Sequence, residues 1–256
     1  GNSLVKRFID KANKTTRDEI ERLVAGEAIE KSVRLELTYD EIDNSIDNIW
    51  SVLFTTGYLT QIGMTEYGKY KLIIPNKEVR EVYKLQIQEW FDKKMRDNTE
   101  QLTAFWDSVE KGNAEAVEQY LNRTLSNSIS VFDTKAPEKE KENSYHTLLV
   151  GLLTGNSDWM VKSNAEAGEG FADIMIEPED PDKGIIFELK YSKEASGLEK
   201  ACERAIEQIK DRRYSEYLEN EGRNDMLFYG IAFCKKRCKA VVEKTRGESC
   251  NNAVGE

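Results

Sequence analysis

Two short apolar runs late in the chain are separated by a charged, turn-rich segment. Residues 171–176 and 184–190 are rich in Ile, Phe and Leu, and the segment between them contains Pro178 and Pro181. Apolar runs of this length, bounded by such turn residues, are typical of paired buried strands. The pattern therefore predicts a hairpin that lies inside a sheet.

The flanking residues predict that this hairpin belongs to an α/β unit, followed by a disordered tail at 243–256. Apolar side chains at helical spacing indicate one helix before the hairpin and one after it. The later helix begins at a predicted capping box formed by Ser196 and Glu199. The expected order is a helix at 142–153, strands at 158–165, 171–177 and 184–191, a helix at 196–214 and a strand at 226–233.

The first half of the chain, residues 1–132, has mainly the helical pattern. Its helices are expected to begin near Val5, Thr16, Asp40 and Asn76, with two shorter ones near 99–111 and 113–125. A strand is predicted at 33–37, and a hairpin at 57–62 and 70–76. A helix followed by such a hairpin predicts a winged-helix-like module. The charged, proline-marked segment 133–141 is the expected linker between two domains.

Composition narrows the function classes. The 256 residues are 39% hydrophobic and 33% charged, with a net charge of −10. No apolar run approaches the roughly 20 residues of a membrane span, and there is no signal-peptide pattern, so we expect a cytoplasmic protein without a membrane partner. The negative charge argues against a protein that coats nucleic acid, but not against a nuclease, because local charge matters more. The basic run Lys235–Lys239 is either a phosphate contact or a solvated strand end.

The small number of cysteines and histidines in the chain argues against several kinds of site. It has four cysteines without a CxxC pair and a single histidine, His146. A structural zinc site and a disulfide framework are therefore not expected, nor is a hydrolase that needs two histidines. There is also no P-loop sequence, so this chain alone should not hydrolyse ATP in that way.

Two carboxylates and a lysine lie on the predicted hairpin. Asp173 is on its first strand, and Glu188 and Lys190 share one face of the second, because side chains alternate along a strand. Buried charges are costly unless they bind a cation or each other. The spacing therefore predicts a magnesium-dependent phosphodiesterase site, although charged residues at strand ends are also common without any function.

The motif residues resemble those of the PD-(D/E)xK nuclease superfamily. The resemblance is carried by Glu142-x-x-Tyr145-His146, by the segment from Ser163 to Asp173, by Glu188-x-Lys190, and by Gln208 with Tyr214. More closely, the chain is similar to the C-terminal nuclease-like domain of bacterial AAA-ATPase-like proteins, preceded by the middle region of that family at 50–59 and 74–80. This implies a restriction-endonuclease-like αβββαβ core at 142–242 and an AAA-ATPase-like domain upstream of this chain.

The resemblance also implies roles for five residues. Asp173 and Glu188 would hold Mg²⁺ or Mn²⁺, and Glu142 would complete the metal site or support a second ion. Lys190 would position or deprotonate the attacking water and offset charge in the transition state. Gln208 would orient the water or a phosphate oxygen.

Three other residues near the motif each allow two interpretations. Glu166 is either a ligand or a loop carboxylate, His146 either a satisfied structural residue or a site residue, and Tyr214 either core or substrate contact. Phe171 stands where related sequences often carry a basic residue, which would weaken a phosphate contact from this strand.

Two main functional hypotheses follow. The first is a Mg²⁺-dependent nuclease that hydrolyses nucleic acid, with DNA favoured over RNA. The second is a regulatory module that keeps the nuclease fold and binds nucleic acid or protein without cleaving it. A third is an interaction fragment whose winged-helix-like half docks the ATPase-like domain.

Overall fold

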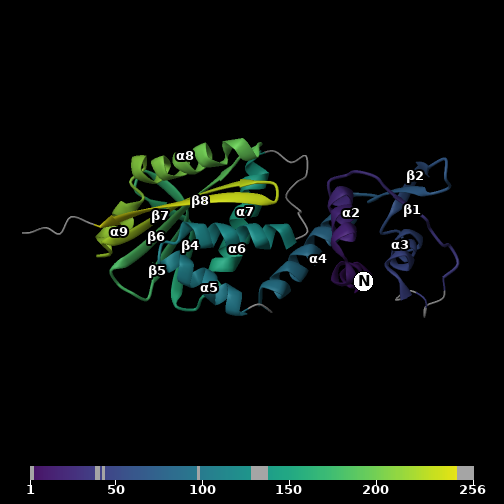
Figure 1. Ribbon diagram of the computed structural model, residues 1–256, viewed down its shortest axis with the longest axis horizontal. Coiled ribbons are helices and arrows are strands. Elements are labelled where there is room, and N and C mark those ends of the chain that lie inside the picture. Colours follow the sequence, from purple (N-terminus) through teal and green to yellow (C-terminus); the bar gives the residue numbers. More distant parts are fainter. Residues whose placement is uncertain (1–2, 38–40, 42–43, 97–98, 128–137, 247–256) are drawn as a thin grey trace, which may run out of the picture. The chain divides into compact units, whose positions relative to one another are not determined.

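The computed structural model describes residues 3–37, 41, 44–96, 99–127 and 138–246, which fold into two compact units (Figure 1). The first unit contains the described residues up to 96, and the second contains 99–127 together with 138–246. Residues 99–127 lie in the second unit, whereas the sequence pattern placed them in the N-terminal domain. Of the predicted linker, 133–137 lie outside the described residues and 138–141 begin a helix.

The first unit packs helices against a small antiparallel sheet. Asn13 and Asn76 cap two of its helices, since each side-chain Oδ1 accepts a hydrogen bond at 2.9 Å, from the Thr16 and Val79 amides respectively. The strand predicted at 33–37 is absent from the described residues, and the neighbouring 29–31 form the strand instead. The elements are α1 (Ser3–Lys11), α2 (Lys14–Val24), α3 (Ile46–Thr55), α4 (Lys77–Arg96), β1 (Ile29–Lys31), β2 (Thr60–Met64) and β3 (Tyr70–Ile73).

The sheet of the first unit has the order β1-β3-β2. β2 and β3 pair antiparallel with a register shift between Gln61 and Met64. The core behind them is built from side chains of α1, α2 and α3, in which Phe8 packs edge-on against Trp50 with ring centroids 4.4 Å apart. The hairpin agrees with the predicted pattern, and its assignment to a winged helix stays a prediction.

The second unit is built on a five-stranded mixed sheet of order β4-β5-β6-β7-β8. Only β6 and β7 pair in parallel, and the other neighbours are antiparallel. The predicted order of helix, three strands, helix and strand is present. The strands are β4 (Trp159–Ala167), β5 (Gly170–Pro178), β6 (Lys183–Tyr191), β7 (Asp225–Cys234) and β8 (Arg237–Arg246).

Helices cover both faces of this sheet. The α8 face buries Ile186 against Ile206 and Ile209. On the opposite face, Phe187 stacks on Tyr229, whose hydroxyl donates to a carbonyl of α5 at 2.9 Å. Figure 1 shows α8 along one side of the sheet and α5 along the other. The helices are α5 (Thr99–Glu110), α6 (Ala114–Asn127), α7 (Glu138–Leu153), α8 (Leu198–Asp211), α9 (Ser215–Asn220) and the short 3₁₀ helix η2 (Ala195–Gly197).

The edge strand β8 explains why α5 and α6 belong to this unit. Asn122 of α6 accepts from the Cys238 amide at 2.9 Å and donates to the Cys238 carbonyl at 3.1 Å. Glu118, one turn earlier, accepts from the Ala240 amide at 3.1 Å. These side chains satisfy backbone groups that an edge strand would otherwise leave open for pairing with another chain.

Three predictions about the second unit need correction. β8 was not predicted, and it takes in 243–246, which were assigned to the disordered tail; the remaining tail lies outside the described residues. The capping box is also wrong. Gly197 is the N-cap of α8 without a side-chain hydrogen bond, and the Ser196 hydroxyl lies 3.4 Å from a carboxylate oxygen of Glu194. The later helix ends at Asp211, and α9 is separate.

Gly230 of β7 pairs with Glu188 of β6 in the parallel register. Because Gly230 has no side chain, α8 can pack closely against β7 at this position. A Cβ on Gly230 would lie 2.5 Å from the Cys202 carbonyl oxygen, which is backbone of α8. We expect Gly230→Ala to lower the free energy of unfolding by about 1–3 kcal/mol through overpacking. Urea unfolding would measure this. Gly151→Ala in α7 is the matched control, because no atom lies within 4 Å of its added Cβ; equal effects of both variants would contradict the prediction.

Candidate active site

Asp173 and Glu188 come together where β5 and β6 separate. The ladder runs to the pair Ile174 and Phe187, and Asp173 and Glu188 are the next residues in that register. Beyond this point the Leu189 amide donates to Asp173 Oδ2 at 2.8 Å instead of to a backbone carbonyl of β5. The neighbouring β4–β5 ladder also omits the position opposite Asp173, where Asn164 has a φ of 49°. The local loss of pairing leaves the Asp173 carboxylate in contact with β6.

His146 of α7 fixes the backbone at the same position. Its Nε2 lies 2.9 Å from the Asp173 carbonyl oxygen and 3.2 Å from Ser163 Oγ. A carbonyl oxygen can only accept, so Nε2 carries the proton in this arrangement. This contact supports the structural interpretation of His146, in which the ring holds the strand that carries Asp173.

Glu188 is a buried carboxylate with one unsatisfied oxygen. The residue is only 2% exposed, and its Oε1 accepts a hydrogen bond from Lys190 Nζ at 2.7 Å. Its Oε2 is buried and has no hydrogen-bond partner among the described residues. Such an atom is costly in a protein interior. Glu188 Oε2 is therefore a destabilising group in the structure as it stands.

The electrostatic environment raises the pKa of Glu188 to about 7. Burial is the largest cause, because it removes water from the charged form. The negative charge of Asp173 raises the pKa further, and the Lys190 ammonium opposes both effects. Near neutral pH the Glu188 carboxyl is therefore partly protonated.

Glu142 reaches the sheet from α7, but at a different point. Its Oε1 accepts from the Tyr191 amide at 3.0 Å, just beyond the end of the β5–β6 ladder. Within the described ranges, no group of three or more His, Cys, Asp or Glu side chains is arranged to hold a metal ion. The structure thus brings Asp173 and Glu188 together, and the predicted third ligand, Glu142, caps the end of β6.

 Gln208 lines a cavity of about 610 Å³ between the β4–β5 turn and α8. Its Nε2 donates to the Tyr214 hydroxyl at 3.2 Å. Among the described residues, no hydrogen bond joins Gln208 to Asp173, Glu188 or Lys190. Its predicted role at the reacting phosphate therefore stays a prediction.

The two remaining ambiguous residues have clear positions. Tyr214 is buried in the apolar core beneath α8, which favours the packing interpretation. Glu166 is exposed on β4 and pairs with Phe171 in the β4–β5 ladder. Glu166 is therefore a surface carboxylate on the hairpin.

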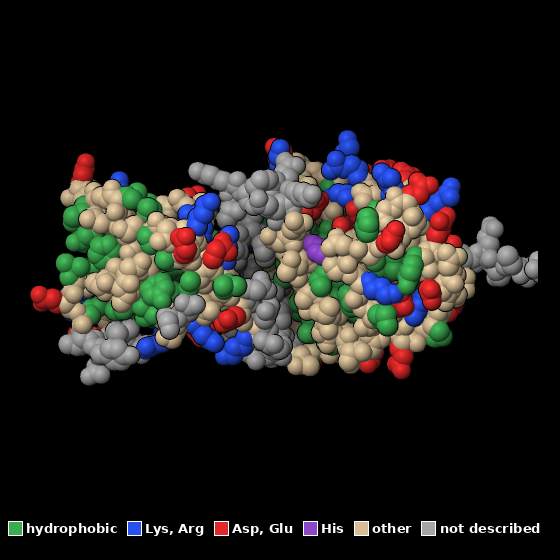
Figure 2. All heavy atoms as spheres, turned by 180° about the vertical axis from the view of Figure 1, so that it is seen from behind, with side chains coloured by type: hydrophobic (Ala, Val, Ile, Leu, Met, Phe, Trp, Pro, Cys, Tyr) green, Lys and Arg blue, Asp and Glu red, His purple; other side chains and the backbone are tan. Residues whose placement is uncertain are grey.

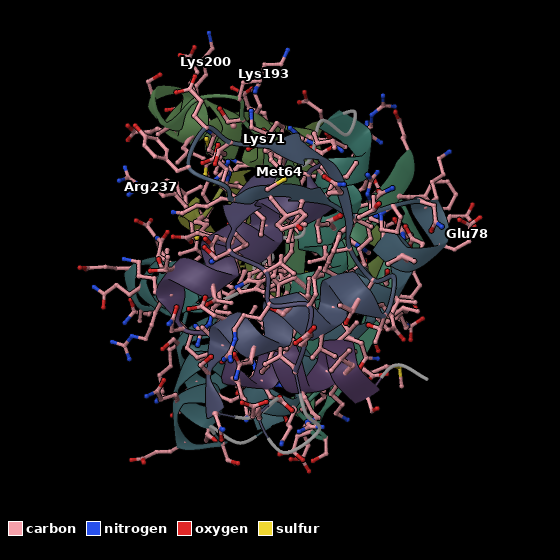
Figure 3. The ribbon with its side chains drawn as sticks, turned by 90° about the vertical axis from the view of Figure 1, so that its right-hand side faces the viewer. Met64, Lys71, Glu78, Lys193, Lys200 and Arg237 are labelled. Carbon is pink, nitrogen blue, oxygen red and sulfur yellow. The ribbon has the colours of Figure 1, made fainter. Side chains whose placement is uncertain are left out.

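A basic region lies beside the end of β6. Figure 3 shows Lys193, Lys200 and Arg237 projecting outward from the second unit. The Lys193 carbonyl accepts from Cys234 Sγ at 3.5 Å, so the residues after Lys190 lie against the β7–β8 turn. The run Lys235–Lys239 was visible in the sequence, but its proximity to Lys193 depends on strand pairing and no local pattern indicates it.

Comparison with known families agrees with this architecture. Residues 140–243 match the family model described as the PD-(D/E)XK nuclease superfamily, a range that includes all five predicted site residues. The match supports the superfamily assignment of this unit. No curated protein matches the chain. In the described part of the chain, no helix combines the length and the apolar character that a membrane span needs.

Proposed function

We propose that this protein is a Mg²⁺-dependent nuclease that hydrolyses phosphodiester bonds of nucleic acid. The observation that carries the proposal is the unsatisfied, buried Glu188 Oε2 beside Asp173 and Lys190, in a unit that matches a nuclease superfamily. In the wider proposal, the chain works together with an AAA-ATPase-like domain upstream.

The residues present fit a divalent metal. A buried carboxylate oxygen without a partner, next to a second carboxylate, is a hard-oxygen donor set of the kind that Mg²⁺ and Mn²⁺ prefer. Asp173 and Glu188 would hold the ion, with Glu142 as the proposed further ligand. When bound, the metal would supply Lewis-acid stabilisation of the phosphate and lower the pKa of a bound water.

The protein's own groups would prepare the site for this chemistry. Lys190 Nζ already donates to Glu188 and keeps part of its surface exposed, with a side-chain exposure of 23%. It could therefore orient an incoming water and offset charge on the phosphate as the bond breaks. His146 would keep Asp173 in place through the carbonyl contact.

Nucleic acid is the proposed substrate because of local charge, in spite of the net charge of −10. Figure 2 shows acidic and basic side chains interspersed over one face of the second unit. The basic region of Lys193, Lys200 and Arg237 lies next to the end of the strand that carries Glu188 and Lys190. It would bind the phosphate backbone on one side of the site. We propose DNA as the first substrate to test, and RNA as the second.

A cleavage assay with the whole chain tests the proposal. Labelled single-stranded DNA, duplex DNA and RNA would be incubated with Mg²⁺, with Mn²⁺ and with EDTA. We expect at least one substrate to be cleaved with metal, no cleavage in EDTA, and recovery after excess Mg²⁺ is added. Absence of cleavage with every substrate and both metals would contradict the proposal.

The structure also contains an observation that favours the second hypothesis, a non-catalytic binding module. Asp173 Oδ2 and Glu142 Oε1 each accept a hydrogen bond from a backbone amide of β6. These two carboxylates therefore help to hold the end of β6 in place. This hypothesis predicts that no substrate is cleaved, whether or not a metal ion binds. The cleavage assay therefore separates the two functions, and calorimetric titration with Mn²⁺ shows whether a site without cleavage still binds metal.

A further inference from the structure

Phe171 is an exposed aromatic residue close to the candidate active site. It is 62% exposed, and in the described part of the second unit only Met160 is a comparably exposed large hydrophobic residue. Phe171 precedes Asp173 by two residues on β5, which places their Cα atoms about 7 Å apart. An aromatic ring at this distance from a reacting phosphate is within reach of a neighbouring nucleotide.

The ring borders the cavity of about 610 Å³ that Gln208 also lines. The charged residues that line this cavity are Arg204, Arg212, Glu169, Glu207 and Asp211. This mixture of donors and acceptors suits the polar edge of a base. The three acidic residues outnumber the two arginines, which makes the same cavity a poor site for a negatively charged phosphate group.

We infer that Phe171 and this cavity form a nucleobase-stacking subsite next to the scissile phosphate. The inference rests on the proposed function and makes its substrate more specific. Only a base whose face is free can stack on Phe171, so the preferred substrate carries an unpaired base at this position, as in single-stranded DNA or RNA. Base stacking on an aromatic side chain is tolerant of sequence, so no strong base preference is expected.

Binding measurements test the subsite without requiring cleavage. Fluorescence anisotropy in EDTA would compare wild type, Phe171→Ala, Phe171→Trp and Met160→Ala on a labelled single strand, a duplex, and an abasic strand of equal length. We expect Phe171→Ala to weaken binding to the single strand about tenfold, and Phe171→Trp to retain it. Met160→Ala, the matched exposed control on β4, should bind as wild type does.

The abasic strand separates stacking from other roles of Phe171. If the ring stacks on bases, wild type and Phe171→Ala should bind the abasic strand equally. Equal binding of both proteins to the normal single strand, or an equal loss on the abasic strand, would overturn the inference. So would a wild-type dimer that becomes monomeric in Phe171→Ala, because the ring would then be a protein contact. If the protein cleaves nucleic acid but Phe171→Ala binds the single strand as wild type does, the proposed function stands and the subsite is wrong. If Phe171→Ala weakens binding but no substrate is cleaved, the subsite stands and the proposed function is wrong.

Discussion

Glu188→Gln is expected to reduce metal-dependent cleavage by about 10³-fold while the fold is retained. The substitution keeps the size of the side chain but removes the charge that a metal ion requires. Lys190→Ala should cause a loss of similar size, about 10²–10⁴-fold, because it removes the ammonium that we propose orients the water and offsets charge on the phosphate. Initial rates of cleavage at saturating Mg²⁺ would measure both effects.

Glu166→Gln is the matched control for these variants. It neutralises an exposed carboxylate on β4 of the same sheet, and we expect its rate to stay within about twofold of wild type. Intact cleavage by both Glu188→Gln and Lys190→Ala would exclude this site as the origin of the activity.

The second large effect concerns pH in the metal-free protein. The pKa of Glu188 is raised from 4.5 to about 7 in the folded chain, so folding favours its protonated form. The contribution of Glu188 to the free energy of unfolding is therefore fully present below pH 4.5 and is lost as the pH rises through 7. In EDTA, the free energy of unfolding of wild type should fall relative to that of Glu188→Gln as the pH rises from 5 to 8. The expected relative fall is on the order of 2–3 kcal/mol.

Urea unfolding of both proteins at the two pH values would measure this shift. Using the difference between them cancels the titration of groups that do not interact with Glu188, which leaves the effects of Glu188 and of its neighbours Asp173 and Lys190. Mg²⁺ should reverse part of the effect at pH 8, because it favours the ionised carboxylate. A stability difference that does not change with pH would contradict the raised pKa of Glu188.

The strands that carry the site were predictable because their signal is local. Side-chain alternation places Glu188 and Lys190 on one face, and the turn residues between 177 and 183 mark the hairpin. The register then brings Asp173 opposite Glu188. No contact between distant elements is needed for this part of the prediction.

The parts that could not be predicted depend on contacts between distant segments. β8 begins in a charged run that resembles a solvated turn, and it is stabilised at its edge by Glu118 and Asn122 from α6. Glu142 and Gln208 lie on the expected helices, but their hydrogen bonds to Tyr191 and Tyr214 are set by packing. Sequence patterns give the element of such a residue and leave its partner open.

A crystal structure of the whole chain soaked with Mn²⁺ tests the central proposal most directly. The anomalous signal of Mn²⁺ identifies the ion and its position independently of activity. We predict a peak between the Asp173 and Glu188 carboxylates, with Glu188 Oε2 as a ligand, and no peak there in Glu188→Gln. A wild-type crystal without a peak at this position, under conditions where the protein cleaves nucleic acid, would contradict the proposed metal site.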